Sequence, residues 1–74
     1  MHIENLIKMA NQIGQFFDAD PDHALAVEEI RQHLIKFWAP QMRKQIQDYV
    51  LAGGEGIGAR AKEAIETLPT PVVG

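Results

Sequence analysis

Apolar residues recur at helical spacing through most of the 74-residue chain. The first run places its apolar side chains on one helical face, and we predict a helix over residues 3–17. These positions are Ile3, Leu6, Ile7, Ala10, Ile13, Phe16 and Phe17. Phe16 and Phe17 point to different sides of a helix, so both cannot lie at the centre of one narrow core. Gly14 weakens the helix by about 1 kcal/mol relative to Ala, so we expect a neighbouring backbone to come close there.

A second helix is predicted over residues 21–37, after the acidic turn at residues 18–22. Asp20 is a suitable N-cap and Pro21 suits the first helical position. Asp22 then falls in the first turn, where the helix dipole favours negative charge. The apolar positions of this segment again have helical spacing: Ala24, Leu25, Val27, Ile30, Leu34, Phe37 and Trp38.

Proline and glycine divide the rest of the chain. Pro40 cannot continue a regular helix and disfavours a helical conformation at the preceding residue, so we predict a break at residues 38–39. A third helix is predicted over residues 40–51, ended by Gly53 and Gly54. A short fourth helix follows over residues 59–67. The apolar positions of these two helices are Met42, Ile46, Tyr49 and Val50, then Ala61, Ala64, Ile65 and Leu68.

The pattern predicts an all-α fold, a small bundle of three helices plus a glycine-rich loop and a short fourth helix. No run alternates with period two, so no strand is expected. Residues 1–68 are predicted to form a single helical domain and residues 69–74 a flexible C-terminal tail. A domain of this size buries only about 60% of its unfolded surface. The chain has no cysteine, which excludes disulfides and thiolate metal sites, so partner binding is the remaining way to add buried area.

Composition argues against several partners and compartments. The N-terminal segment lacks the basic-then-apolar pattern of a secretory leader. No apolar run approaches the roughly 18 residues of a membrane span, so we expect a soluble cytoplasmic protein that binds no membrane. The formal net charge of −3 argues against nucleic-acid binding. One local basic stretch could face an acidic partner or lie on a solvated helix face; it contains Arg31, Lys36, Arg43 and Lys44.

The acidic and histidine residues do not predict a metal site. His23 and His33 lie about 15 Å apart along one helix, too far to share an ion. The acids of residues 18–22 resemble the first ligands of a calcium loop, but Pro21 at the fourth position and the helix that follows argue against one. Capping and turn formation explain these acids.

Nucleophilic catalysis is also not predicted. The chain has no serine and no cysteine, and its aliphatic hydroxyls are Thr67 and Thr70. No histidine–acid pair is placed near them by the sequence. We therefore expect no catalytic, cofactor-binding or metal-ligating residue, and no enzyme activity from this chain alone.

Four glycines fall within residues 53–58. A phosphate-binding loop would follow a strand and end in Gly-Lys-Ser/Thr, and this segment does neither. It is either a helix C-cap with a flexible turn or a docking loop in which glycine lets a partner approach the backbone. We name Gly53, Gly54 and Gly56 as candidate partner contacts.

The segment of residues 37–43 is the main candidate docking region. Trp, Met and Arg are enriched at the centres of protein interfaces. The candidate contacts are Phe37, Trp38, Pro40, Met42 and Arg43. Trp38 could instead fill the core. Because Phe37 and Trp38 lie about 100° apart on a helix, burial of one would leave the other available to a partner.

Three blocks together resemble the delta subunit of NAD-dependent, molybdenum-containing formate dehydrogenase. They are residues 5–17, residues 35–43 and residues 52–57, followed by Ala64, Leu68 and a proline-containing tail. The resemblance covers nearly the whole chain. The chain departs from the family pattern at Ala39, at Gln41 and at residues 58–60, which puts individual charge contacts in doubt.

The resemblance implies a non-catalytic subunit of a cytoplasmic complex that interconverts formate and carbon dioxide with NAD. It implies docking on the alpha subunit, with a supporting role in assembly, stability or activity. The alpha subunit is expected to carry a molybdenum or tungsten bis-pterin centre and iron–sulfur clusters, and other subunits flavin. The delta subunit holds no known cofactor. The residues leave two alternatives, a small helical DNA-binding domain and a self-associating adaptor.

Overall fold

A computed structural model describes residues 2–69 and contains four helices within them. These are α1 (Ile3–Phe17), α2 (His23–Phe37), α3 (Pro40–Leu51) and α4 (Ala59–Glu66). No strand occurs in this part of the chain. The all-α class and the order of three longer helices, a glycine-rich loop and a short fourth helix are therefore confirmed. Most of the predicted tail, residues 70–74, lies outside the described residues, and the division into a domain of residues 1–68 and a tail of residues 69–74 stays a prediction.

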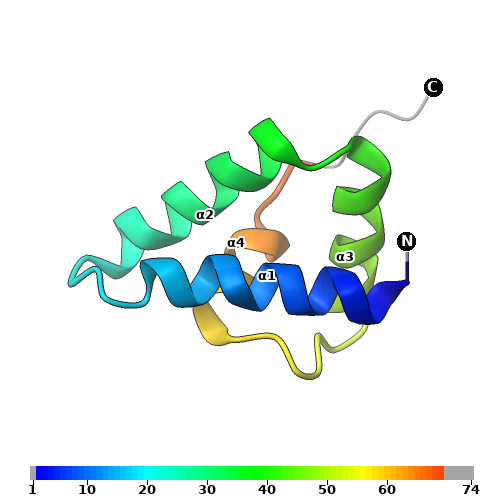
Figure 1. Cartoon of the computed structure of the whole chain (residues 1–74), viewed down its shortest axis with the longest axis horizontal. Coiled ribbons are helices and arrows are strands. Elements are labelled where there is room, and N and C mark those ends of the chain that lie inside the picture. Colours follow the sequence, from blue (N-terminus) through cyan, green and yellow to red (C-terminus); the bar gives the residue numbers. More distant parts are fainter. Residues whose placement is uncertain (1, 70–74) are drawn as a thin grey trace.

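The helices surround α4 (Figure 1). α1 and α2 diverge from a shared turn at one end of the molecule, and α3 stands at the opposite end. α4 lies behind α1 and contacts each of the other three helices. This arrangement lets one short helix complete a core that the three longer helices only partly enclose.

The start of α2 differs from the prediction by two residues. Asp22, not Asp20, is the N-cap, and its carboxylate accepts a hydrogen bond from the backbone N–H of Leu25 at 3.1 Å. Asp20 instead accepts one from the N–H of Asp22 at 2.9 Å. The acid three residues before Leu25 has the spacing that a capping bond requires, whereas Asp20 forms the local turn typical of Asp. Pro21 therefore precedes the helix.

The break between α2 and α3 is confirmed. Trp38 has extended dihedral angles of −93° and 139°, and Ala39 has −64° and 150°. Pro40 then occupies the first turn of α3, where its missing N–H leaves no hydrogen bond unmade. The two extended residues turn the chain, so α3 packs across the end of the molecule instead of prolonging α2.

The core is formed by one face of each helix. Its largest fully buried side chains are Leu6, Ile30, Leu34, Ile46 and Ile65. The predicted apolar faces of α3 and α4 are confirmed: Ile46, Val50, Ala61, Ala64, Ile65 and Leu68 are buried, and Met42 and Tyr49 pack against the core.

The predicted apolar face of α2 was wrong in part. Ala24 is exposed, and Leu25 and Phe37 are 48% and 72% exposed, whereas Ala26 is buried. The buried line of α2 runs through Ala26 and Ile30 because these positions, four residues apart, lie above one another on the helix. Apolarity alone did not distinguish this line from its neighbours.

The close approach predicted at Gly14 is confirmed. A Cβ atom at this position would lie 3.2 Å from Cβ of Ala61 and 3.8 Å from its backbone nitrogen. Two small residues therefore let α1 and α4 pack with their backbones near one another.

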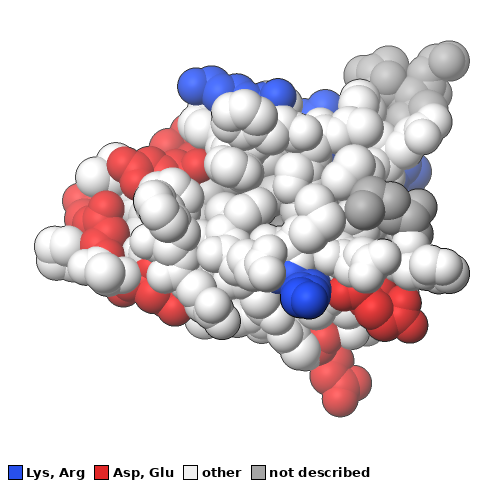
Figure 2. Space-filling view, in the orientation of Figure 1, with Lys and Arg blue, Asp and Glu red and all other residues white. Residues whose placement is uncertain are grey.

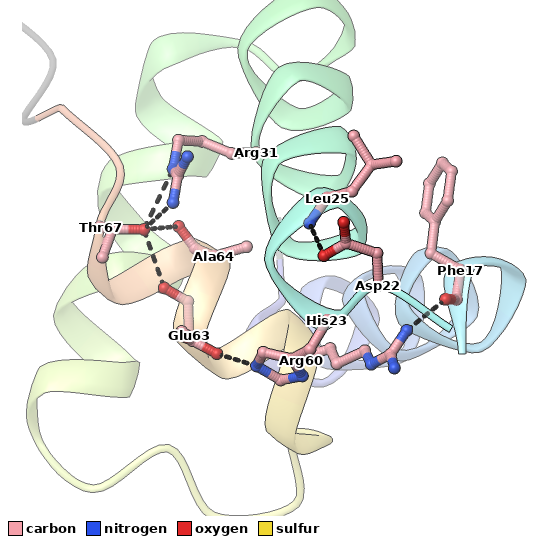
Figure 3. A network of polar contacts seen from close by, with 9 residues as sticks. All are labelled: Phe17, Asp22, His23, Leu25, Arg31, Arg60, Glu63, Ala64 and Thr67. Carbon is pink, nitrogen blue, oxygen red and sulfur yellow. Dashed lines mark hydrogen bonds and ion pairs between the residues drawn. The ribbon is translucent and has the colours of Figure 1, made fainter. Parts of the chain in front are cut away.

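Polar contacts tie the ends of α1 and α2 to α4 (Figure 3). Arg60 donates a hydrogen bond to the backbone carbonyl of Phe17 at 2.8 Å. His23 and Glu63 form a hydrogen-bonded pair between the start of α2 and the exposed side of α4. This carbonyl at the end of α1 also accepts from the backbone N–H of Asp20 at 3.2 Å, so Arg60 adds a second donor there and links the end of α1 to α4.

Two further contacts hold the end of α4. Arg31 donates to Oγ1 of Thr67 from Nε at 3.0 Å and from Nη2 at 2.6 Å (Figure 3). The buried amide of Gln47 donates to the carbonyl of Leu68 at 2.7 Å and to that of Ile65 at 3.3 Å. Gln47 thus gives the carbonyl of Leu68 a donor and adds a second one to the carbonyl of Ile65, which also accepts from the backbone N–H of Leu68 at 3.2 Å.

Candidate docking surface

Phe37 and Trp38 point to opposite environments. Trp38 is 5% exposed and belongs to the hydrophobic core. Phe37 is 72% exposed, and its ring centroid lies 4.8 Å from that of His33 one turn earlier. The expectation that burial of one would leave the other available is confirmed. A partner contact by Trp38 stays a prediction, and its burial leaves only a small edge for such a contact.

The rest of the 37–43 segment does not form one exposed surface. Pro40 is exposed at the start of α3. Met42 is half-buried and packs against the core. Arg43 is also half-buried, and its Nε atom is buried without a hydrogen-bond partner among the described residues. The predicted docking residues therefore divide between the core and the surface.

The glycine segment first serves the fold. The N–H of Gly53 donates to Val50 and that of Gly54 to Tyr49, at 3.0 and 3.1 Å. These two bonds are those of a Schellman motif, so the predicted stop after α3 is confirmed. Gly53, Gly54 and Gly56 have φ values of 137°, 65° and 86°, which L side chains rarely adopt.

Contacts within the molecule hold the glycine loop in place. The side chain of Asn11 donates to the carbonyl of Gly56 at 2.8 Å and accepts from the N–H of Gly58 at 2.9 Å. The hydroxyl of Tyr49 donates to the carbonyl of Glu55 at 2.6 Å. These bonds explain the glycine geometry without a partner, and a docking role for the loop stays a prediction.

A groove between α1 and α2 is the surface that the sequence did not predict. It has a volume of about 520 Å³ and is mostly apolar. Its lining consists of Met9, Gln12, Ile13, Phe16, Phe17, His33 and Trp38. Phe16 is 79% exposed and meets Phe17 edge to face, with ring centroids 5.0 Å apart. α1 therefore presents a row of apolar side chains to this groove: Phe16 is mostly exposed, and Met9, Ile13 and Phe17 are only partly buried against the core.

The groove continues along α2 into a second hollow of about 310 Å³. Phe17 and His33 line both hollows, and Phe37 lines the second. The other residues of the second hollow are Glu28, Glu29, Gln32 and Lys36. We call the two hollows together the α1–α2 groove. Figure 2 shows that uncharged atoms cover most of this face of the molecule.

A signal for this groove was present in the sequence as two aromatic pairs, residues 16–17 and 37–38. In each pair one aromatic residue packs against the core and the other is exposed. By its position in the sequence, Phe37 was grouped with the residues that follow it. In the structure, Phe37 lines the same hollow as Phe17, which lies on the other helix.

Two charged regions noted in the sequence are partly used within the molecule. The carboxylates of Asp20 and Asp22 accept backbone N–H bonds in the α1–α2 turn. Arg31 pairs with Glu28, and Lys44 with Asp48 at 3.0 Å. Among residues 2–69, no three His, Cys, Asp or Glu side chains come together as a metal ion would require. No helix in this part of the chain is long and apolar enough to cross a membrane.

Comparison with known families gives one match. The family model described as "NADH-dependant formate dehydrogenase delta subunit FdsD" matches residues 5–65. The chain belongs to this family. The match begins in α1 and extends to within one residue of the end of α4, so it covers most of each of the four helices. No curated protein and no solved structure gave a significant match.

Proposed function

We propose that this chain is a non-catalytic subunit that docks on the molybdenum-containing alpha subunit of a cytoplasmic NAD-dependent formate dehydrogenase. There it supports the assembly, stability or activity of the complex. The family match over residues 5–65 carries this proposal. The inventory of the chain supports it, because a sequence without cysteine and serine offers neither cluster ligands nor the commonest nucleophiles.

The cofactors of the reaction belong to other subunits in this proposal. A bis-pterin molybdenum or tungsten centre, iron–sulfur clusters, flavin and NAD would supply the redox chemistry there. The contribution of this chain is binding. Its two most exposed aromatic residues, Phe16 and Phe37, are the kind of side chain that dominates interface energies once a partner covers it.

The docking surface proposed here differs from the one named from the sequence. Phe37 stays in it, whereas Trp38 acts mainly through the core. A Trp38→Ala chain would lose stability and binding together and could not separate them. Phe37→Ala removes a side chain that is already 72% exposed, so the fold should survive and binding alone should change.

The first experiment is co-expression of all subunits of the complex with an affinity tag on this chain. We expect the alpha subunit to co-purify and the eluate to reduce NAD with formate. Recovery of this chain without any formate dehydrogenase subunit would contradict the proposal.

A matched pair of variants then tests the surface. Phe37→Ala should lower the recovered alpha subunit about tenfold, as expected for an aromatic anchor. Leu51→Ala is the control, because Leu51 is 69% exposed on α3 and does not line the α1–α2 groove. Equal recovery with both variants would remove Phe37 from the interface.

A further inference from the structure

We infer that the α1–α2 groove receives one amphipathic helix of the alpha subunit, with a basic residue over Glu29 and an acidic residue over Lys36. This inference rests on the proposed function and adds the chemistry and orientation of the docked segment. The groove supplies the apolar contact, and the two charges at its edge determine the orientation of the docked helix.

The shape of the groove favours a single helix. Its walls are α1 and α2, and apolar side chains line it from Met9 at one side to Phe37 at the other. Each rim carries a mostly exposed aromatic residue, Phe16 on α1 (79% exposed) and Phe37 on α2 (72% exposed). A third helix laid between two helices contacts both rims with one apolar stripe, as in other helix-in-groove complexes.

The charges at the groove give the occupant a direction. Glu28 is already held by Arg31 and by the amide of Gln32. Glu29 and Lys36 also line the groove, and neither has an ion pair or hydrogen bond from its side chain within residues 2–69. They are seven residues apart on α2, so they lie almost on one line, about 10.5 Å apart along the axis. An occupant with the opposite charges two turns apart complements both.

The wider surface has the same polarity. Figure 2 shows acidic side chains around the α1–α2 turn and the first part of α2, and basic side chains along the edge near the C-terminal end of α2. The α1 wall of the groove contributes no charged residue. The field across the groove therefore runs from negative at the α1–α2 turn to positive at the end of α2, which favours one orientation of a docked helix.

A second copy of this chain is a poorer occupant. In a symmetric dimer the same surface would face itself. Two concave grooves would then meet at their rims, with Phe16 and Phe37 of both copies in contact and the floors uncovered. Glu29 of one copy could still pair with Lys36 of the other. Charge alone does not separate the two occupants, so the experiment must do so.

The test is a double charge reversal, Glu29→Lys with Lys36→Glu, in the full chain co-expressed with the complex. This double substitution leaves the net charge and the amino-acid composition of the groove unchanged. Docking on the alpha subunit should weaken about tenfold or more, because both charges then face like charges. A symmetric dimer would keep its binding, because both copies change together and the opposite charges still meet. The readout is the amount of this chain per tagged alpha subunit.

A photo-crosslinking residue in place of Phe37 identifies the occupant, with the same residue in place of Leu51 as the control. We expect crosslinks from position 37 to one amphipathic helix of the alpha subunit. Reversal of the matching acid and base on that helix should restore docking of the double variant. Circular dichroism and urea unfolding check that the double variant folds like the native chain.

Other outcomes overturn the inference. Crosslinks from position 37 to a second copy, or normal docking of the double variant on the alpha subunit, would exclude an oriented helix in the groove. So would an intact complex in which position 37 crosslinks to nothing. In those three cases the proposed function survives if the alpha subunit still co-purifies. If the alpha subunit did not co-purify with the native chain, both the proposed function and the inference about the groove would be overturned.

Discussion

The α4 side of the molecule and the α1–α2 groove contrast in how completely their groups are used. At α4, small side chains bring the backbones together, and Arg60 and Gln47 occupy carbonyls at helix ends. At the groove, two aromatic residues are mostly exposed, and the charges of Glu29 and Lys36 have no partner among the described residues. The groups of the first region are paired within the chain, whereas the second leaves apolar and charged groups without a partner among the described residues.

This difference separates stability from function. In a domain this small, the three longer helices cannot bury enough apolar surface by themselves. The contacts around α4 must supply most of the remaining buried area. The exposed rim residues of the groove, Phe16 and Phe37, add little to the fold, so they are free to serve binding. Substitutions should therefore divide into two classes, and the following four predictions run from the largest expected change in stability to the smallest.

Trp38→Ala should have the largest effect. Removing an aromatic side chain that is 5% exposed costs about 3–5 kcal/mol in a core. That is a large part of the stability of a small domain. Circular dichroism during urea unfolding measures the change. If Trp38→Ala lowered the free energy of unfolding by less than Phe37→Ala does, Trp38 would not be a core residue. It would then be assigned to the docking surface again.

Gln47→Leu should lower stability by about 1–3 kcal/mol, because the carbonyl of Leu68 loses its side-chain donor and that of Ile65 keeps only the backbone N–H of Leu68. The control is Gln41→Leu on the exposed start of the same helix, which should change stability by less than about 0.5 kcal/mol. Equal unfolding midpoints for the two variants would mean that the amide of Gln47 does not hold the end of α4.

Gly14→Ala should lower stability slightly, although alanine favours a helix by about 1 kcal/mol. The added Cβ would lie 3.2 Å from Cβ of Ala61, so α1 and α4 must separate. In a chain that also carries Ala61→Gly, the same substitution should become stabilising by about 1 kcal/mol, because the obstructing methyl is gone. A double-mutant cycle in urea measures this reversal of sign, and its absence would place the two helices farther apart.

Phe16→Ser should change stability least, by less than about 0.5 kcal/mol, because the side chain is 79% exposed. Its effect should appear in binding, as a lower yield of the alpha subunit in co-purification. Phe17, which packs against the core, is the matched comparison, and Phe17→Ser should lower the unfolding midpoint. A stability loss at both positions would mean that the groove is part of the fold.

Much of the fold was predictable because helices are specified locally. The periods of apolar residues and the positions of proline and glycine gave the bounds of α1 and α3 and the end of α2. The start of α2 was misplaced because Asp20 and Asp22 both have capping chemistry, and only the carboxylate–N–H geometry distinguishes them. The buried faces of α3 and α4 were predicted, since each has one apolar stripe.

The docking surface was less predictable. The sequence identified the family and named Phe37 as a candidate contact, but it did not predict the groove, because the residues that face each other across it are 11 or more positions apart in the chain. When two aromatic residues are adjacent, the sequence pattern does not tell which of the two is buried. Tertiary packing decides that Trp38, in the extended segment after α2, is buried while Phe37 at the end of α2 is exposed.

The sequence by itself determined the helices, their order, the close approach at Gly14 and the family to which the chain belongs, because each depends on short-range pattern or on residues in a fixed order. The tertiary structure decided which faces are buried and which residues meet. Glu29, Lys36, Phe16 and Phe37 become one surface only when α1 and α2 diverge from their turn. Burial and charge pairing are properties of the whole packed chain, so local periodicity could not specify them.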